Sequence, residues 1–464
     1  MSTINTLIKA GSSEVFRTIE IKRRDATTGL FEPEWQDISA DVKKWGVIKS
    51  EIDAIRLNKF KFANMKTTFI NDTGKYNEES DPASFWFGFL PQQRTLVRFK
   101  AGFFKDTLTA DGIWQRNRFP DSTVWDGSSW DQESSQWDNN STTFVGMVSG
   151  DILGSDSNQI TLNIRPTVQI FRDYAAKNLT AYDSSMTASK FMEMVRDHQD
   201  VNGNYIFRPF FGDTTTEWEI SNTTAIYPDL NTSTANDVVD SNVWKIIEKL
   251  AEAENHVVYT NKNGKFIFKN KDDLTTTAFE FHGLNSLDTQ FGHTIKKISS
   301  YGPKISKLYT RVEIQHNEAS TSTSFEVREA TLTVSANSTA WIYGQKTLSI
   351  KNFFMDATLA ESLATSIFNE VSALKNEIKF SSSFVPQLDV LDRATITYNS
   401  GEFSYGSLWD LNNWGDTTSG IDSGDLVWND AQGDALDFTD KEFKILSYEI
   451  DLDKLESRFI AREV

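Results

Sequence analysis

The stretch Arg393-Ala-Thr-Ile-Thr-Tyr398 decides the fold, because the plan that it begins occurs twice in the chain. It alternates polar and apolar residues, and residues 441–451 and 457–463 do the same. Alternation with a period of two is typical of a half-buried antiparallel strand, whose successive side chains face opposite sides of the sheet. Three strands are therefore predicted, with a long insert at 399–440, rich in Trp, Asp and Gly, between the first two.

The same plan appears near the start of the chain. Residues 94–100 and 142–148 are predicted strands on either side of a second Trp- and Asp-rich insert, 101–141, and residues 159–165 close the set. The identities match only loosely. We therefore predict a repeated architecture of two related β domains, each with a long insert at the same corner.

Three segments have helical rather than strand periodicity. Residues 187–198 place apolar side chains on one helical face behind Thr187, which can cap the helix. Residues 241–255 have an apolar stripe at helical spacing, and Ser241 is the expected cap. Residues 356–375 repeat apolar side chains every three or four positions. We predict a helix at each place.

Two shorter predictions complete the central region. Residues 256–269 contain two alternating runs joined by Asn263-Gly264, the dipeptide that tight hairpin turns favour. A β-hairpin is predicted there. Residues 207–211 are expected to form a short strand.

The chain is too long, at 464 residues, for a single hydrophobic core. We divide it into a first β domain (1–165), a central α+β region (166–304) and a second β domain (305–464). The predicted fold class is mainly β with α+β middle modules.

The composition excludes several protein classes. Hydrophobic content of 39% and charged content of 24% are ordinary for a soluble globular protein. No apolar run approaches the ~20 residues that span a bilayer, and the first ten residues do not have the pattern of a signal peptide. The absence of cysteine excludes disulfides, zinc-thiolate sites and cysteine nucleophiles.

No catalytic or cofactor motif stands out. The five histidines lack the His-Glu-x-x-His spacing, and the chain has no phosphate-binding loop, nucleophile elbow or dinucleotide-binding glycine triplet. Asp451 and Asp453 resemble the start of a calcium loop, but the required glycine is missing. A pair of catalytic carboxylates could still be hidden among 65 acidic residues. We expect a protein without enzymatic activity and without a cofactor.

The net charge of −18 argues against nucleic-acid recognition, which normally uses a basic face. No block of Lys or Arg stands out in the sequence. No specific nucleic-acid binding is predicted.

The tryptophans are the most unusual feature, since seven of 13 fall in the two inserts. Long loops without periodicity are uncommon inside compact domains and usually serve function. Three interpretations remain open: the rings cover their own domain, they grip neighbouring proteins as interface hot spots, or they stack on sugars. The candidate interaction residues are Trp114, Trp125, Trp130, Trp137, Trp409, Trp414 and Trp428.

The order of these elements resembles the tail and baseplate hub proteins of tailed bacteriophages, a contractile-tail hub-like family, and also the tail hubs of siphophages and gene transfer agents. The helix that ends at Glu254, with the hairpin after it, is similar to the family's central module. Segments 308–314, 386–397, 443–451 and 458–463 resemble its second barrel, and 55–58, 74–76 and 87–90 its first.

The resemblance implies two tail-tube-like antiparallel β-barrels plus central helix-hairpin domains. It implies a homotrimer whose six barrels form a ring at the tail tip or baseplate of a virion. Such a structural protein joins the tail tube or distal tail protein to spike or fibre proteins, and DNA passes through its lumen. The Trp-rich inserts are not a general family feature. The alternative is a carbohydrate-binding protein of the tail tip that recognises the host surface.

Overall fold

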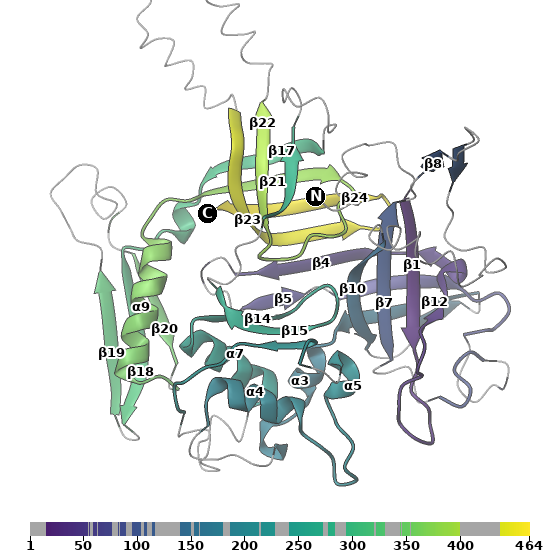
Figure 1. Ribbon diagram of the computed structural model, residues 1–464, viewed down its shortest axis with the longest axis horizontal. Coiled ribbons are helices and arrows are strands. Elements are labelled where there is room, and N and C mark those ends of the chain that lie inside the picture. Colours follow the sequence, from purple (N-terminus) through teal and green to yellow (C-terminus); the bar gives the residue numbers. More distant parts are fainter. Residues whose placement is uncertain are drawn as a thin grey trace, which may run out of the picture.

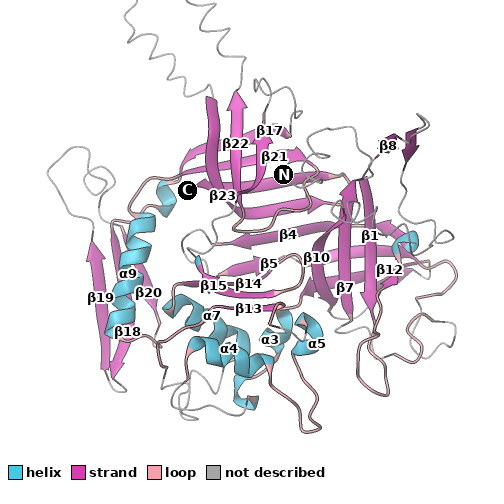
Figure 2. Cartoon of the chain, viewed as in Figure 1, coloured by secondary structure: helices cyan, strands magenta, loops and turns pink. Residues whose placement is uncertain are grey.

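The chain is mainly β in the computed structural model, as its sequence predicts (Figure 1). Two eight-stranded sheets lie above and beside a layer of helices, and a smaller sheet lies next to one long helix (Figure 2). The structure describes residues 15–464 except 54, 56–58, 63, 77–81, 83, 90–94, 104–105, 109–113, 117–139, 150–152, 157, 180–185, 213–214, 228–240, 272–276, 284–293, 320–321, 330–343, 345, 353 and 400–436.

The first sheet is antiparallel throughout its strand pairs. Its strands, in spatial order, are β2 (Gln36–Asp37), β1 (Val15–Lys22), β7 (Leu96–Phe103), β10 (Asn140–Val148), β12 (Gln159–Pro166), β6 (Met65–Ile70) and β3 (Val42–Lys44), with β11 (Leu153–Asp156) beside β12. The insert after β7 contains the short hairpin of β8 (Asp106–Leu108) and β9 (Trp114–Arg116).

The second sheet contains the alternating stretch Arg393–Tyr398. Its strands, in spatial order, are β16 (Thr277–His282), β22 (Arg393–Asn399), β23 (Asp437–Asp451), β24 (Glu456–Glu463), β21 (Asn376–Ser383) and β17 (Ile295–Pro303), and β4 (Val47–Ile52) joins β23 and also pairs with β5 (Phe60–Phe62). The repeat predicted from the sequence is present in this topology. The spatial order β1-β7-β10-β12-β6-β3 corresponds strand by strand to β16-β22-β23-β24-β21-β17, and both sets have the same order along the chain.

The two Trp-rich inserts also occupy corresponding places. One leaves the sheet between the neighbours β7 and β10, and the other between the neighbours β22 and β23. The pairing of the described strands follows an open path in each sheet. Among the described strands, no pairing joins the two edges of either sheet into a closed barrel.

The central region contains the predicted helices and hairpin. Thr187 caps α4, as predicted, by accepting a hydrogen bond from the Lys190 N–H. Residues 207–211 are not a strand; Pro209, whose missing N–H suits a first helical turn, lies in α5 instead. The elements are α3 (Gln169–Asp173), α4 (Ala188–Arg196), α5 (Arg208–Phe211), α7 (Val243–Ala253), β13 (Trp218–Ile220), β14 (His256–Thr260) and β15 (Phe266–Asn270).

The cap of α7 is also different from the prediction. Asn242, rather than Ser241, accepts the hydrogen bond from the Lys245 N–H, at 2.9 Å. Both residue types cap helices well, so composition alone could not choose between adjacent positions.

A small sheet with α9 on it separates β17 from β21 along the chain. Its strands are β19 (Ser322–Glu329), β18 (Arg311–Ala319) and β20 (Thr347–Lys351), and α9 spans Ala357–Val371. Single turns of 3-10 helix occur at Ser39–Asp41, Ala176–Asn178 and Ile305–Lys307. No helix in the described part of the chain is long and apolar enough to cross a membrane.

The corner between β3 and β4 carries the chain from the first sheet to the second. The backbone N–H groups of Trp45 and Gly46 donate to the Asp453 carboxylate at 2.9 and 3.0 Å. Gly46 has φ +91°, and a Cβ there would lie 2.3 Å from the Lys66 carbonyl oxygen, so no other residue fits. Nearly all buried apolar residues of the described part form one continuous cluster across both sheets and the helices.

Candidate functional site

The predicted tryptophans are largely beyond what the structure describes. Trp114 lies in β9, opposite Leu108 of β8. The others lie outside the described residues: Trp125, Trp130, Trp137, Trp409, Trp414 and Trp428. They stay a prediction, and the candidate site below comes from residues that sequence reasoning did not select.

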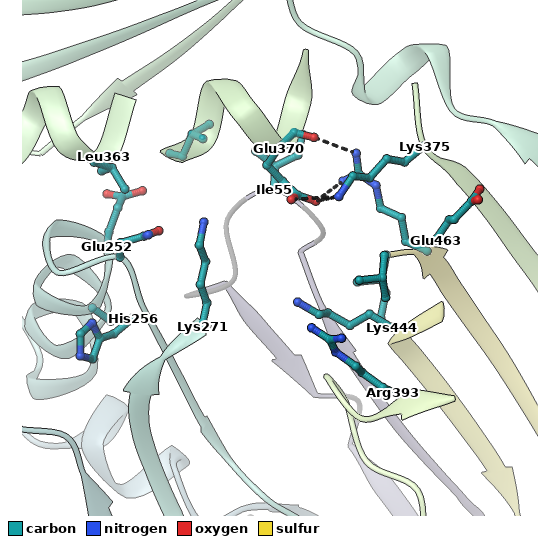
Figure 3. Close-up of a pocket in the computed structure, with 16 residues that line it drawn as sticks. Ile55, Glu252, His256, Lys271, Leu363, Glu370, Lys375, Arg393, Lys444 and Glu463 are labelled. Atoms are coloured by element: carbon teal, nitrogen blue, oxygen red, sulfur yellow. Dashed lines mark hydrogen bonds and ion pairs between the residues drawn. The ribbon is translucent and has the colours of Figure 1, made fainter. Parts of the chain in front are cut away.

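A cavity of about 220 Å³ lies where the second sheet meets α7 and α9 (Figure 3). Part of its wall is apolar: Ala251 of α7, Leu363 and Ile367 of α9, and Leu446 of β23. The rest is charged. Its cationic side chains are Lys271, Lys375, Arg393, Lys444 and Arg462, and its carboxylates are Glu252, Glu370 and Glu463.

Three of the cations form a row across the second sheet. In the strand register, Arg393 of β22 lies opposite Lys444 of β23, and Lys444 lies opposite Arg462 of β24. Cross-strand partners lie on the same face, about 4.5–5.5 Å apart at Cβ, and like charges placed so are destabilising. Glu377 of β21 ends the row beside Arg462, with its carboxylate bound to the Lys307 ammonium. The sheet therefore holds three adjacent positive charges at the cavity.

Glu370 balances one end of this row. Its carboxylate lies 3.2 Å from the Lys375 ammonium and 3.6 Å from the Arg462 guanidinium, and Figure 3 shows the Lys375 side chain turned toward it. Glu463, also at the cavity, bonds to Lys441 at 2.9 Å and Asn376 at 2.7 Å. Glu370 therefore compensates the Arg462 end of the row, whereas these contacts of Glu463 are with groups outside it.

Lys444 is the cation that is least compensated. Burial lowers the pKa of its ammonium, the neighbouring positive charges of Arg393, Lys271 and Lys375 lower it further, and Glu370 opposes them. The ammonium makes no hydrogen bond or ion pair with a described residue. Unpaired positive charge with restricted hydration favours an anion as a partner.

Arg393 is only weakly paired. Its nearest carboxylate, that of Glu442, lies 3.6 Å away and is 49% exposed, so solvent screens the pair. The Nε of Arg393 is buried without a hydrogen-bond partner among the described groups. This guanidinium can therefore donate a hydrogen bond to a further acceptor oxygen.

A second ionisable cluster lies at the tip of the β14–β15 hairpin. The Lys262 N–H donates to Asp389 at 2.7 Å, and the Asp389 N–H donates to Asp392 at 2.8 Å. Burial raises the pKa of Asp389 to about 7, and the nearby Asp392 charge raises it as well. The Lys262 ammonium donates to the Gln387 carbonyl. These contacts bind the central hairpin to the segment that leads into β22.

The described residues contain no group of three His, Cys, Asp or Glu side chains that could hold a metal ion. Asp451 and Asp453, which resemble the start of a calcium loop in the sequence, have other partners. Asp451 accepts from the N–H groups of Asp453 and Lys454 within its own turn, and Asp453 binds the β3–β4 corner.

Sequence reasoning missed the cavity because its charged residues are spread from Glu252 to Glu463. No short motif unites them. The only local sign of the cavity in the sequence is one cation within the alternating pattern of each of β22, β23 and β24. A cation at such a position is typical of any exposed strand face. Their alignment depends on strand register, which a single sequence does not reveal.

Comparisons with known proteins give a fold likeness at low identity. No family model and no curated protein matches the chain. Solved structures that it resembles include a tail protein from Neisseria meningitidis MC58, with TM-score 0.48 and 6% identity over 97% of this chain and 96% of that one. A prophage tail protein from Listeria monocytogenes EGD-e has TM-score 0.46 and 10% identity, covering 96% and 94%.

A 43 kDa prophage tail protein from Shewanella oneidensis is similar as well, with TM-score 0.42 and 10% identity over 96% of this chain and 98% of that one. Likenesses of this strength describe the course of the backbone only, and the functional proposal below is based on this chain's own sequence and topology.

Proposed function

We propose that this protein is a structural component of a phage-type tail, the hub at its distal end. The observation that carries the proposal is the repeated sheet: six strands occur twice in the same order in space and along the chain, with a long insert at the same hairpin. The order of sequence segments that resembles tail hub proteins supports it. A catalytic role is not part of the proposal.

The repeat suggests how the protein assembles. Each subunit supplies two related sheets, so a homotrimer presents six, and cyclic closure is the usual way in which such subunits bury their free edges. A threefold ring of this kind can meet a sixfold tail tube or distal tail protein on one side. Spike or fibre proteins are its proposed partners on the other, in the virion's tail tip or baseplate.

The charge suits a channel through which DNA slides. Affinity for DNA comes mainly from Lys and Arg contacts to phosphates. A chain with net charge −18 is expected to repel passing DNA rather than bind it specifically. The competing explanation is that the acidic surface only promotes solubility. A ring whose inner wall is mainly Lys and Arg would rule out the repelling channel.

The mass of the purified protein in solution tests the assembly. A trimer of 52.6 kDa subunits, about 158 kDa, is expected by sedimentation or native mass spectrometry. A monomer at all concentrations would contradict the hub and favour the alternative, a carbohydrate-binding protein that recognises the host surface.

The Trp-rich inserts are proposed to grip neighbouring tail proteins, since Trp is enriched in interface hot spots. Alanine at Trp125, Trp130 and Trp137 together tests this. A folded trimer that no longer joins the tail supports the proposal. Loss of thermal stability instead means that the rings cover their own domain, and normal assembly with failed adsorption to the host means that they bind sugars.

A further inference from the structure

We infer that the cavity between the second sheet, α7 and α9 is a binding site for a small phosphate-type anion. The inference is independent of the proposed tail function, because it follows from the charge and geometry of this cavity alone. Its central contact is the row Arg393–Lys444–Arg462, aligned by the register of β22, β23 and β24.

The balance of charged side chains in the cavity favours an anionic ligand. The side chains that line the cavity include five cations and three carboxylates, so positive side chains outnumber negative ones there. In a chain with net charge −18, such an excess runs against the overall composition. Placing three like charges opposite one another costs stability, and a bound anion offsets that cost.

The donors suit tetrahedral oxyanions better than a single carboxylate. Arg393 has a buried Nε without a described partner, and a guanidinium presents its donors in a planar fork that matches phosphate oxygens. The Lys444 ammonium supplies a further point charge beside it. Figure 3 shows both side chains, together with Lys271, extending into the same space.

The size of the cavity limits the ligand. Its 220 Å³ is far above the roughly 10–15 Å³ that one water needs, and below the ~300–1,000 Å³ of pockets for drug-sized molecules. Inorganic phosphate or pyrophosphate meets both limits. The apolar wall, which includes Leu363 and Ile367 of α9, keeps part of the site away from solvent and strengthens the charge interaction.

The test uses the full chain and three proteins: the wild type, Lys444→Met, and the matched control Lys61→Met. Lys61 is a 67%-exposed lysine of β5 that is not among the residues lining the cavity. Thermal unfolding is followed at constant ionic strength while millimolar pyrophosphate or phosphate replaces chloride. Calorimetric titration of pyrophosphate measures binding directly.

A rise in Tm of roughly 1–2 °C or more is expected for the wild type and Lys61→Met, and none for Lys444→Met. In chloride alone, Lys444→Met is expected to be at least as stable as the wild type, because the row loses a repelling charge. This combination separates a ligand-binding lysine from a merely structural one. General stabilisation by excluded salts would raise Tm equally in all three proteins.

An equal shift in all three proteins, or no shift and no heat of binding in the wild type, would overturn the inference. If Lys444→Met proves misfolded by circular dichroism, Arg393→Gln takes its place, with the same loss of response expected. A retained response in a folded Arg393→Gln protein would also contradict the site.

Discussion

The two eight-stranded sheets share their strand order but differ at one edge. β1 runs antiparallel to β7 in the first sheet, whereas its counterpart β16 runs parallel to β22 in the second. The four strands that follow have the same pairing sense in both sheets. The difference lies where constraint is weakest, because an edge position can accept a strand in either direction without disturbing the pairs behind it.

The sheets also differ in what separates the second and third strands of each six-strand set along the chain. Between β3 and β6, the chain crosses to the other sheet as β4 and β5. Between β17 and β21, it builds the small sheet of β18–β20 with α9. In the second sheet α9 therefore lies just before β21 along the chain, and residues of α9 and of the second sheet together line the cationic cavity. The repeat supplies the framework, and the connections give each copy its own surroundings.

The largest expected effect comes from truncating a large core side chain in either copy. Phe459 of β24 lies 5.3 Å from Phe281 and 5.5 Å from Phe380 between ring centroids, and Ile164 occupies β12, the matching strand of the first sheet, fully buried. Phe459→Ala should cost about 3–5 kcal/mol of unfolding free energy, and Ile164→Ala about 2–5 kcal/mol.

Denaturant unfolding measures both losses, with Val201→Ala as the control. Val201 is fully exposed, so a change below about 0.5 kcal/mol is expected for it. Because one buried cluster spans both sheets, each core variant should shift a single shared transition. Two separate transitions would show that the copies fold as independent units.

Substitution at the β3–β4 corner, where the chain crosses between the sheets, is expected to destabilise the protein nearly as much. Gly46→Ala should destabilise the protein by about 2–4 kcal/mol, because its positive φ is joined by a Cβ clash at 2.3 Å with backbone. Gly203 is the matched control, since it has φ +82° and open space around it. Gly203→Ala should cost about 1 kcal/mol, because only the unfavourable positive φ, and no clash, opposes the added Cβ. If thermal unfolding showed equal losses of stability for the two variants, the β3–β4 corner would have shifted to make room for the added Cβ.

The β14–β15 hairpin contacts both sheets, and we expect only its contact with the second sheet to make stability depend on pH. Gly264 at its tip approaches apolar Val145 of the first sheet, whereas Lys262 and the buried Asp389 meet on the side of the second. The pKa of Asp389 is raised to about 7, so the folded chain holds this proton more tightly than the unfolded chain does. The contribution of protonated Asp389 to the free energy of unfolding is greatest near pH 4 and is lost as the pH rises to about 7.

Asp389→Asn removes this titration. The difference in unfolding free energy between the variant and the wild type should therefore move in the variant's favour between pH 4 and 7, by more than about 1.4 kcal/mol, the value of one pKa unit. Denaturant titrations at several pH values measure it. A constant difference across that range would contradict the raised pKa.

The smallest effect is expected at the exposed end of the crossing. Asp453→Ala removes two hydrogen bonds to the N–H groups of Trp45 and Gly46 and should cost about 1 kcal/mol, because these groups can bond to water instead. Asp72, an exposed aspartate in another turn, is the control, and Asp72→Ala should change stability by less than about 0.5 kcal/mol. A larger loss of unfolding free energy for Asp453→Ala would mean that the β3–β4 corner is required to hold the two sheets in their relative positions.

Much of the fold could be predicted from local patterns. The strands of the β22–β24 set, the capped helices α4 and α9 and the hairpin at Asn263-Gly264 all follow from period, cap and turn chemistry. β17 was missed because both of its faces are largely exposed, so it has no apolar alternation. β16 does place Phe279 and Phe281 at a spacing of two, a signal that was present but not used.

By itself, then, the sequence determined the mainly β class, the repeated plan and the places of the two inserts, because these depend on residues close together in the chain. Tertiary structure alone decided that β4 crosses to the second sheet and that Arg393, Lys444 and Arg462 form one row. Both depend on pairing register between distant strands. A shift of one residue would turn each of these cations to the other face, and only the packing of the whole core selects the register.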